Sequence, residues 1–209
     1  MGVSLIYISS ETIVNYVSKN PVNWLEDFKG MAKRGGIGDQ AGVTPTPAIQ
    51  EFLELYHDTK SLFTQRDYRD WCFGRWRNWL EEKPKAQQDG VAVKLYRNFY
   101  PSMIDSLHVW AMLAETKKFD VCVLDSMEDA IGKTDLTLRQ NEIMHRIALQ
   151  IGTKSGIDNR KYKCKHRNGG QEIERIEIWL PMSRSRTPGN KRWYELDDFS
   201  KLLGQMESE

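Results

Sequence analysis

Four short apolar segments in the second half of the chain constrain its fold more than any other feature. They are FDVCVLD (119–125), TDLTLR (134–139), RIALQIGT (146–153) and IERIEIWLPM (173–182). FDVCVLD is an apolar run bounded by acidic turn residues and IERIEIWLPM alternates, and each of the four segments is expected to form a β-strand. RIALQIGT is apolar enough to be a central strand, and Pro181 is expected to close the last one.

Helical patterns surround these strands. Residues 102–116 are expected to form an amphipathic helix, whose apolar stripe is Met103, Leu107, Trp110 and Ala114. A short helix is expected within 155–170, and a last one over 195–206. The predicted order from residue 102 onward is therefore α-β-β-β-α-β-α, an α/β fold.

The first half of the chain reads differently, as mainly helical. A short strand over 3–8 and helices from Ser9 or Ser10, over 21–33, over 47–63 and over 66–83 are expected, with a loop at 35–47 and a break at 82–90. The aromatic stripe of the 66–83 helix is interpreted as core. We thus predict two domains, an N-terminal helical region (1–90) and a C-terminal α/β domain (91–209).

Carboxylates gather at the ends of the predicted strands, at Asp125, Glu128, Asp129 and Asp135. Asp135 lies just inside a strand, where an acid is disfavoured and its desolvation needs compensation. A divalent cation provides such compensation, because hard cations bind carboxylate oxygens. The alternative is a hairpin turn whose acids are solvated, and the local pattern leaves both open.

The next strand favours the metal interpretation. Gln150, Gly152 and Lys154 share one parity and oppose the apolar Leu149 and Ile151. With the strand order, this pattern resembles the PD-(D/E)XK superfamily, which includes restriction endonucleases and junction resolvases and has a restriction-endonuclease-like αβββαβ core.

The resemblance implies a site that binds Mg²⁺ or Mn²⁺. It implies that Asp135 and Gln150 bind the metal and that a lysine two residues after Gln150 assists catalysis. This chain departs from the family there, because Gly152 occupies that position; Lys154 on the same face, or Lys133, are candidate replacements. Further metal ligands would be Asp105 on the first helix, with Glu115 as the weaker option, and Glu128 and Asp129; His108 is interpreted as a packing or surface residue.

Charge is unevenly distributed along the chain. The 30 basic and 29 acidic residues give a net charge of +1, but residues 139–192 hold 13 basic and 5 acidic residues, a net of +8, which leaves −7 elsewhere. We interpret the basic side chains that follow the third strand as a nucleic-acid-binding surface, although a solvated basic loop is the alternative. They are Arg160, Lys161, Lys163, Lys165, Arg167, Arg184, Arg186, Lys191 and Arg192.

Other function classes find little support. The three cysteines form no CxxC pair and the histidines have no zinc spacing, which favours a reducing compartment. We find no signal peptide or membrane-spanning run and expect a cytoplasmic protein. The expected function is a metal-dependent endonuclease acting on DNA in a restriction, recombination or mobile-element setting, compatible with a homodimer. The alternative is a catalytically degenerate nuclease fold that binds nucleic acid, or assembles with partners, without cleavage.

Overall fold

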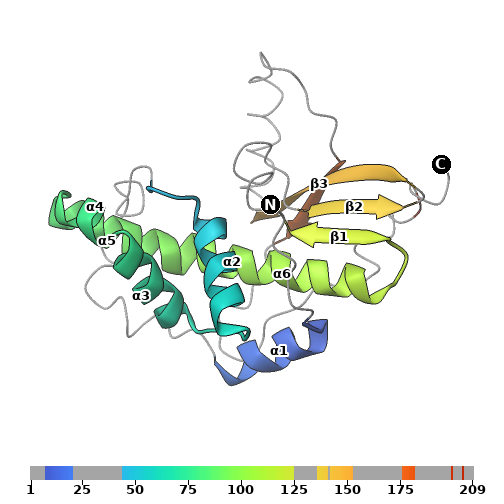
Figure 1. Ribbon diagram of the computed structural model, residues 1–209, viewed down its shortest axis with the longest axis horizontal. Helices are drawn as coiled ribbons and strands as arrows, with labels where there is room; N and C mark the ends of the chain where they lie inside the picture. Colours follow the sequence, from blue (N-terminus) through green and yellow to red (C-terminus); the bar gives the residue numbers. More distant parts are fainter. Residues whose placement is uncertain are drawn as a thin grey trace, which may run out of the picture. The chain divides into compact units, whose positions relative to one another are not determined.

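The computed structural model describes residues 8–20, 44–124, 136–140, 142–152 and 176–181, together with Phe199 and Gly204. The protein is mixed α/β (Figure 1). Its chain forms two compact units, one made of residues 1–14 and 105–209 and the other of residues 15–104. We call them the sheet unit and the helical unit. The division into domains at residue 90 remains a prediction.

The sheet unit contains a four-stranded sheet in the order β1-β2-β3-β4. The strands are β1 (Val121–Leu124), β2 (Leu136–Gln140), β3 (Ile143–Gly152) and β4 (Ile176–Pro181). β1 and β2 pair antiparallel, as do β2 and β3, whereas β3 and β4 pair parallel. All four predicted strands are thus confirmed, and β3 begins three residues earlier than the sequence predicted.

One face of this sheet is apolar and buried. Leu136 and Leu138 of β2 and Ile147 of β3 are fully buried, and Leu138 pairs with Cys122 of β1. Because side chains alternate along a strand, Arg139 and Arg146 belong to the opposite face, and both are exposed. The sheet therefore has one face in the core and one face that reaches solvent over at least part of its length.

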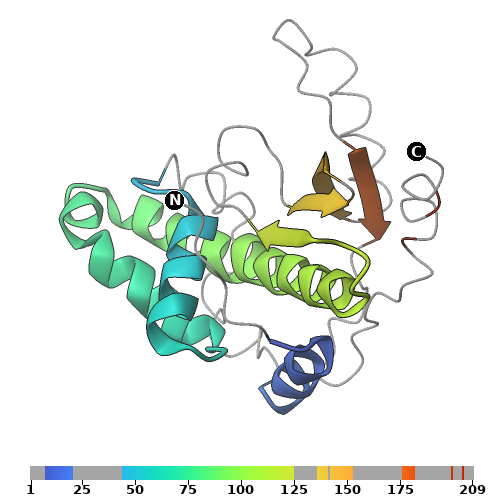
Figure 2. The same cartoon turned by 45° about the vertical axis from the view of Figure 1, so that its right-hand side comes forward.

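Helix α6 (Tyr100–Glu115) covers the apolar face. The Trp110 indole Nε1 donates a 2.8 Å hydrogen bond to the Cys122 carbonyl, and the Cys122 thiol lies 3.8 Å from the Trp110 carbonyl. Both views show the helix running along the sheet (Figures 1 and 2). The predicted helix is confirmed, but residues 104–113 are buried without interruption, so the prediction that one stripe alone is buried is wrong.

Helix α1 (Ser10–Lys19) begins where the sequence predicted. Glu115, the last residue of α6, receives hydrogen bonds from the Ser10 backbone N–H (2.7 Å) and from the Ser10 hydroxyl (2.6 Å). A carboxylate at this position satisfies amide groups that a helix N-terminus leaves without intrahelical partners.

The helical unit is built around a cluster of aromatic rings. Its helices are α2 (Ala48–Thr59), α3 (Gln65–Arg75), α4 (Arg77–Glu81), α5 (Lys85–Lys94) and the π-helix η2 (Leu95–Phe99). Phe52, Phe63, Tyr68 and Tyr100 lie with ring centroids 4.7–6.3 Å apart. The buried Tyr68 and Tyr100 hydroxyls donate to main-chain carbonyls at 2.8 and 2.7 Å. Such pairing removes the cost of burying their polar groups.

Two predicted features of this region are wrong. The helix expected over 66–83 is divided at Trp76, whose indole donates to Thr46 and Glu51 and whose backbone (φ −97°, ψ 14°) is not helical. The break expected over 82–90 is confined to the residues before Lys85, because Pro84 ends one helical segment and suits the start of the next.

A proline explains the π-helix that precedes α6. Pro101 has no N–H, and its ring conflicts with the carbonyl four residues earlier in a regular α-helix. The Tyr100 N–H bonds to the Leu95 carbonyl, five residues back, so neither residue 100 nor residue 101 donates to the Tyr96 carbonyl. The Gln65 side-chain amide takes that place with a 2.9 Å hydrogen bond.

Several predictions fall outside the described residues. They are the strand over 3–8, the helix over 21–33, the turn between β1 and β2, the helix within 155–170 and most of the helix over 195–206. Among the helices that the structure does describe, none is long and apolar enough to cross a membrane.

Candidate functional site

The ends of the strands define where a site can form. β1 ends at Leu124 beside Leu136, the first residue of β2, and Leu136 pairs in turn with Ile147 of β3. From there β3 continues to Gly152, paired with β4 up to Pro181. We call this the carboxyl end of the sheet, because β1, β3 and β4 all finish there.

Every predicted site residue outside α6 and β3 belongs to a segment that joins the sheet at this end. Residues 125–135 connect β1 to β2, residues 153–175 follow β3, and residues 182–198 follow β4. Asp135, Glu128, Asp129 and Lys154 lie in the first two segments, outside the described residues, as does Lys133. The same is true of Arg160, Lys161, Lys163, Lys165, Arg167, Arg184, Arg186, Lys191 and Arg192.

Asp105 is the acid that the structure describes at this end. It is buried (3% exposed) and lies five residues before Trp110 on α6, about 7.5 Å along the helix axis. Trp110 is hydrogen-bonded to Cys122, and Leu124 lies two residues further along β1, about 6.6 Å in the same direction. Because α6 and β1 run antiparallel, Asp105 is level with the carboxyl end of the sheet.

Gln150 lies in the part of β3 that extends beyond the ends of β1 and β2. Its strand position pairs with Trp179 of β4, and Gly152 pairs with Pro181. Ile147 belongs to the apolar face, so the odd separation of three residues assigns position 150 to the opposite face. The structure thus brings two predicted ligand positions, Asp105 and Gln150, to the same end of the sheet.

The other candidates on α6 have different surroundings. Both carboxylate oxygens of Glu115 accept hydrogen bonds from Ser10, at the opposite end of the helix from Asp105. Glu115 is therefore a helix cap, which removes the weaker of the two acids considered for this helix. His108 is 3% exposed, which agrees with a packing role and rules out a surface position.

Metal ligation is not completed by the described side chains alone. Within the parts of the chain that the structure describes, no group of three or more histidine, cysteine, aspartate or glutamate side chains is arranged to hold a metal ion. Asp105 is the predicted metal ligand of α6 that the structure describes, and the other acids expected from the sequence belong to the 125–135 segment, outside the described residues.

Comparison of the chain with protein-family models, curated proteins and solved structures found no match.

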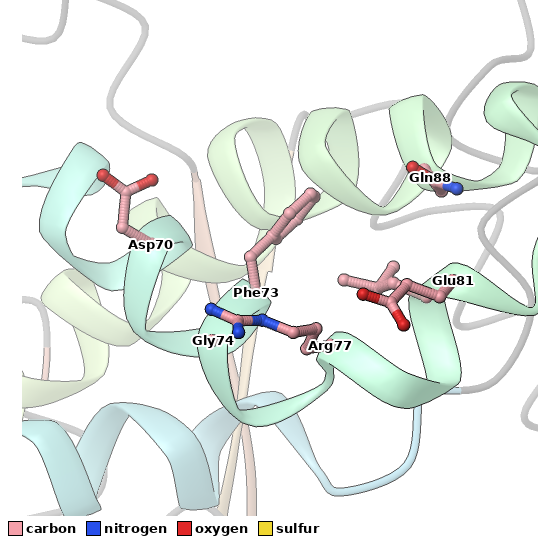
Figure 3. A pocket seen from close by; sticks show the side chains of 7 residues that line it. Asp70, Phe73, Gly74, Arg77, Glu81 and Gln88 are labelled. Atoms are coloured by element: carbon pink, nitrogen blue, oxygen red, sulfur yellow. The ribbon is translucent and has the colours of Figure 1, made fainter.

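The helical unit carries a shallow groove of about 370 Å³ (Figure 3). It is lined by Asp70, Phe73, Gly74, Arg77, Leu80, Glu81 and Gln88. Asp70 accepts hydrogen bonds from Arg69, and a methyl group added at Gly74 would point into open space. The groove combines a small apolar floor with both signs of charge and holds no residue that the sequence predicted for a site.

A buried carboxylate in the helical unit was missed by the sequence analysis. Glu51 of α2 has a fully buried side chain that accepts hydrogen bonds from the Trp71 indole (2.9 Å), the Trp76 indole (3.2 Å) and the Thr46 hydroxyl. Arg75 forms an ion pair with it at 2.8 Å. The sequence signal that could have found it is the helical spacing of Glu51 from Ala48 and Leu55, which puts this acid on the apolar face of α2. With all its partners present, Glu51 organises the fold and offers no free oxygen for a ligand.

Proposed function

We propose that this protein is a metal-dependent nuclease that hydrolyses phosphodiester bonds in DNA. The observation that supports the proposal best is the sheet topology. Two antiparallel pairings followed by a parallel one, with α6 before β1, is the order expected for a PD-(D/E)XK core. The chain segments that hold the predicted acids and the predicted basic residues directly follow β1, β3 and β4, which finish at the carboxyl end of the sheet.

The register supports a specific arrangement of the ligands. Leu136 pairs with Ile147, so extending β2 by one residue would set Asp135 opposite Ala148, two residues from Gln150. Both positions then belong to the face opposite α6. Asp105 approaches from the other side, at the level where β1 and β2 have ended. In this proposed arrangement the three side chains would offer Mg²⁺ the oxygen ligands that it prefers.

Each residue has a role in this proposal. Asp135 and Gln150 hold the cation, with Asp105, Glu128 or Asp129 completing its ligands. Lys154 stabilises the negative charge that develops on the scissile phosphate, and Lys133 is the second candidate for this role. The basic side chains after β3 and β4 bind neighbouring phosphates. When bound, the cation supplies charge neutralisation and a lowered pKa for the attacking water.

A cleavage assay tests the proposal. Purified wild-type protein and the Asp135→Asn variant are incubated with supercoiled plasmid and single-stranded DNA in Mg²⁺ or Mn²⁺. We expect wild-type cleavage that requires the metal and falls about 100-fold or more in Asp135→Asn, the scale of removing one charge-stabilising group. Asp58→Asn, an exposed aspartate of the helical unit, is the matched control and should cut like the wild type. Cleavage that persists in Asp135→Asn would contradict the proposed site.

The absence of lysine at the usual position motivates a second candidate. Gly152 is a strand residue in β3, paired with Pro181, so it presents no side chain to a substrate. A protein with the same fold could then bind nucleic acid, or assemble with partners, without cleaving it. Binding without metal-dependent cutting by the wild type would favour this candidate. Loss of cutting in Lys154→Ala but not in Lys133→Ala would support a relocated lysine.

A further inference from the structure

The groove of the helical unit carries two charges that the described fold leaves unpaired. Arg77 and Glu81 are both exposed and lie four residues apart on α4, a spacing that permits an ion pair, although arginine before glutamate is the weaker order. Among the described residues neither side chain has a hydrogen-bond or ion-pair partner. Figure 3 shows the Arg77 guanidinium turned toward Gly74, away from Glu81. Asp70, by contrast, is already paired with Arg69.

Gly74 is a lining residue that the fold itself does not explain. It lies inside α3, where glycine stabilises a helix less than any residue except proline. A methyl group added at this position would meet no atom within 4 Å, so close packing does not require a glycine here. The missing side chain keeps the groove open to a molecule from outside.

The rest of the lining offers an apolar surface and hydrogen-bond acceptors. Phe73 is half-buried and Leu80 lies beside it in the lining, so a flat ring can pack on them. The Gln88 amide nitrogen donates to the Lys83 carbonyl at 2.9 Å, which leaves the Gln88 side-chain oxygen as an acceptor. Together with the carboxylate of Glu81, this oxygen favours a ring whose edge carries N–H donors.

A nucleotide has the three features that this lining complements. Its phosphate suits Arg77, because a guanidinium binds phosphate with two parallel hydrogen bonds and this one has no described ion pair to break. Guanine presents adjacent N–H donors on its Watson–Crick edge, which match the two oxygens of Glu81. Uracil and thymine present one N–H between two carbonyls, which a carboxylate repels. The donor edge and the phosphate lie at opposite ends of the nucleotide, and the two free charges of the groove also point apart.

We propose that the groove between α3, α4 and α5 binds a guanine nucleotide. The base packs on Phe73 and Leu80, its donor edge bonds to Glu81, and its phosphate bonds to Arg77. The volume of about 370 Å³ lies in the range of small-ligand sites. This site goes beyond the proposed nuclease activity, because it belongs to the helical unit and needs none of the proposed metal ligands. Its ligand is either a free nucleotide or a guanine within single-stranded nucleic acid.

Calorimetric titration of the full chain with GMP, guanosine and UMP tests the site, in EDTA so that no metal-dependent cleavage occurs. Gly74→Leu fills the groove; it should unfold at no lower urea concentration than the wild type, yet bind GMP about tenfold or more weakly. Arg77→Gln should weaken GMP binding about tenfold and leave guanosine binding unchanged. Glu81→Gln should abolish the preference for GMP over UMP.

Two exposed positions outside the lining provide matched controls. Glu82→Gln and Lys85→Gln remove the same charges and should bind GMP like the wild type. Oligothymidine with and without interspersed guanines distinguishes the two sources. Guanine-dependent binding that Gly74→Leu abolishes assigns the ligand to nucleic acid, and GMP binding without it assigns a free nucleotide.

Three results would overturn the proposed site. They are a wild type that binds neither GMP nor the guanine-containing oligonucleotide, binding that is unchanged in a folded Gly74→Leu variant, and binding of a leucine–lysine peptide in place of GMP. Metal-dependent cleavage and its loss in Asp135→Asn are measured separately, so the proposed function stands or fails independently of this site.

Discussion

Glu51 shows how strongly a single residue can organise the helical unit. Its carboxylate is enclosed by two indole N–H groups, a hydroxyl and the Arg75 guanidinium, which together compensate the desolvation of a buried charge. Glu51 itself belongs to α2, and its partners come from α3, from the residue that divides α3 from α4, and from the segment before α2. One side chain therefore joins four parts of the unit.

Replacing Glu51 by glutamine should destabilise the helical unit strongly. The substitution removes the buried charge that pairs with the exposed Arg75 guanidinium and gives two indole donors a poorer acceptor, so a loss of about 1.5–3 kcal/mol in the free energy of unfolding is expected. Urea denaturation followed by tryptophan fluorescence measures it. Glu54→Gln is the control, because Glu54 binds the same arginine at 2.8 Å but is partly exposed. An equal effect of both substitutions would refute the role of burial.

At the scale of elements, Gln65 and Pro101 act as a pair. Gln65→Leu removes the donor to the Tyr96 carbonyl and should cost about 1–3 kcal/mol in unfolding free energy. In a Pro101→Ala background the main chain regains an N–H that can serve this carbonyl, so the cost of Gln65→Leu should fall. A double-mutant cycle by chemical denaturation should give a coupling of about 1 kcal/mol, and additive effects would contradict this account.

The elements also show what the sequence could predict. The four strands were predictable because their apolar runs are short and are bounded by turn residues. The register, which sets Leu136 of β2 opposite Ile147 of β3, depends on pairing between strands and has no local signal. The division at Trp76 was not predictable, because it depends on indole hydrogen bonds to Thr46 and Glu51, about 25–30 residues away in the chain.

The candidate site was predicted less completely. The sequence suggested Asp105 because it lies on the helix that precedes the first strand. Asp105 lies at the height of the carboxyl end of the sheet because α6 and β1 run antiparallel. The sequence could not show that Glu115 caps α1, because its hydrogen-bond partner Ser10 is 105 residues away. The groove of the helical unit was missed because its lining residues come from α3, α4 and α5 and meet only in the folded unit.

For the whole molecule, buried groups predict sensitivity to alkaline conditions. Burial raises the pKa of the Cys122 thiol to about 12, and it also raises the pKa values of Cys72, Tyr68 and Tyr100. These groups stay protonated in the folded protein at pH values where the unfolded chain loses its protons. Their contribution to stability is therefore complete below about pH 9 and is lost progressively as the pH rises through the folded values.

The free energy of unfolding should accordingly fall between pH 9 and pH 11. Each fully affected group contributes a slope of about 1.4 kcal/mol per pH unit once its unfolded form has ionised. Denaturation at intervals of half a pH unit measures the slope, and Cys122→Ala should reduce it even though the substitution itself lowers stability. A flat profile over this range would contradict the assignment of these groups as buried and protonated.

The bond between Ser10 and Glu115 has a consequence for the protein during its synthesis. The two residues are 105 positions apart. At a synthesis rate of about 5–20 residues per second, Glu115 is therefore made about 5–20 s after Ser10. Over that interval α1 depends on its own first turn, where the Ser9 hydroxyl accepts a 3.1 Å hydrogen bond from the Thr12 N–H. The N-terminal residues of the sheet unit are thus synthesised before the rest of that unit, and their bond to Glu115 forms only after α6 has been made.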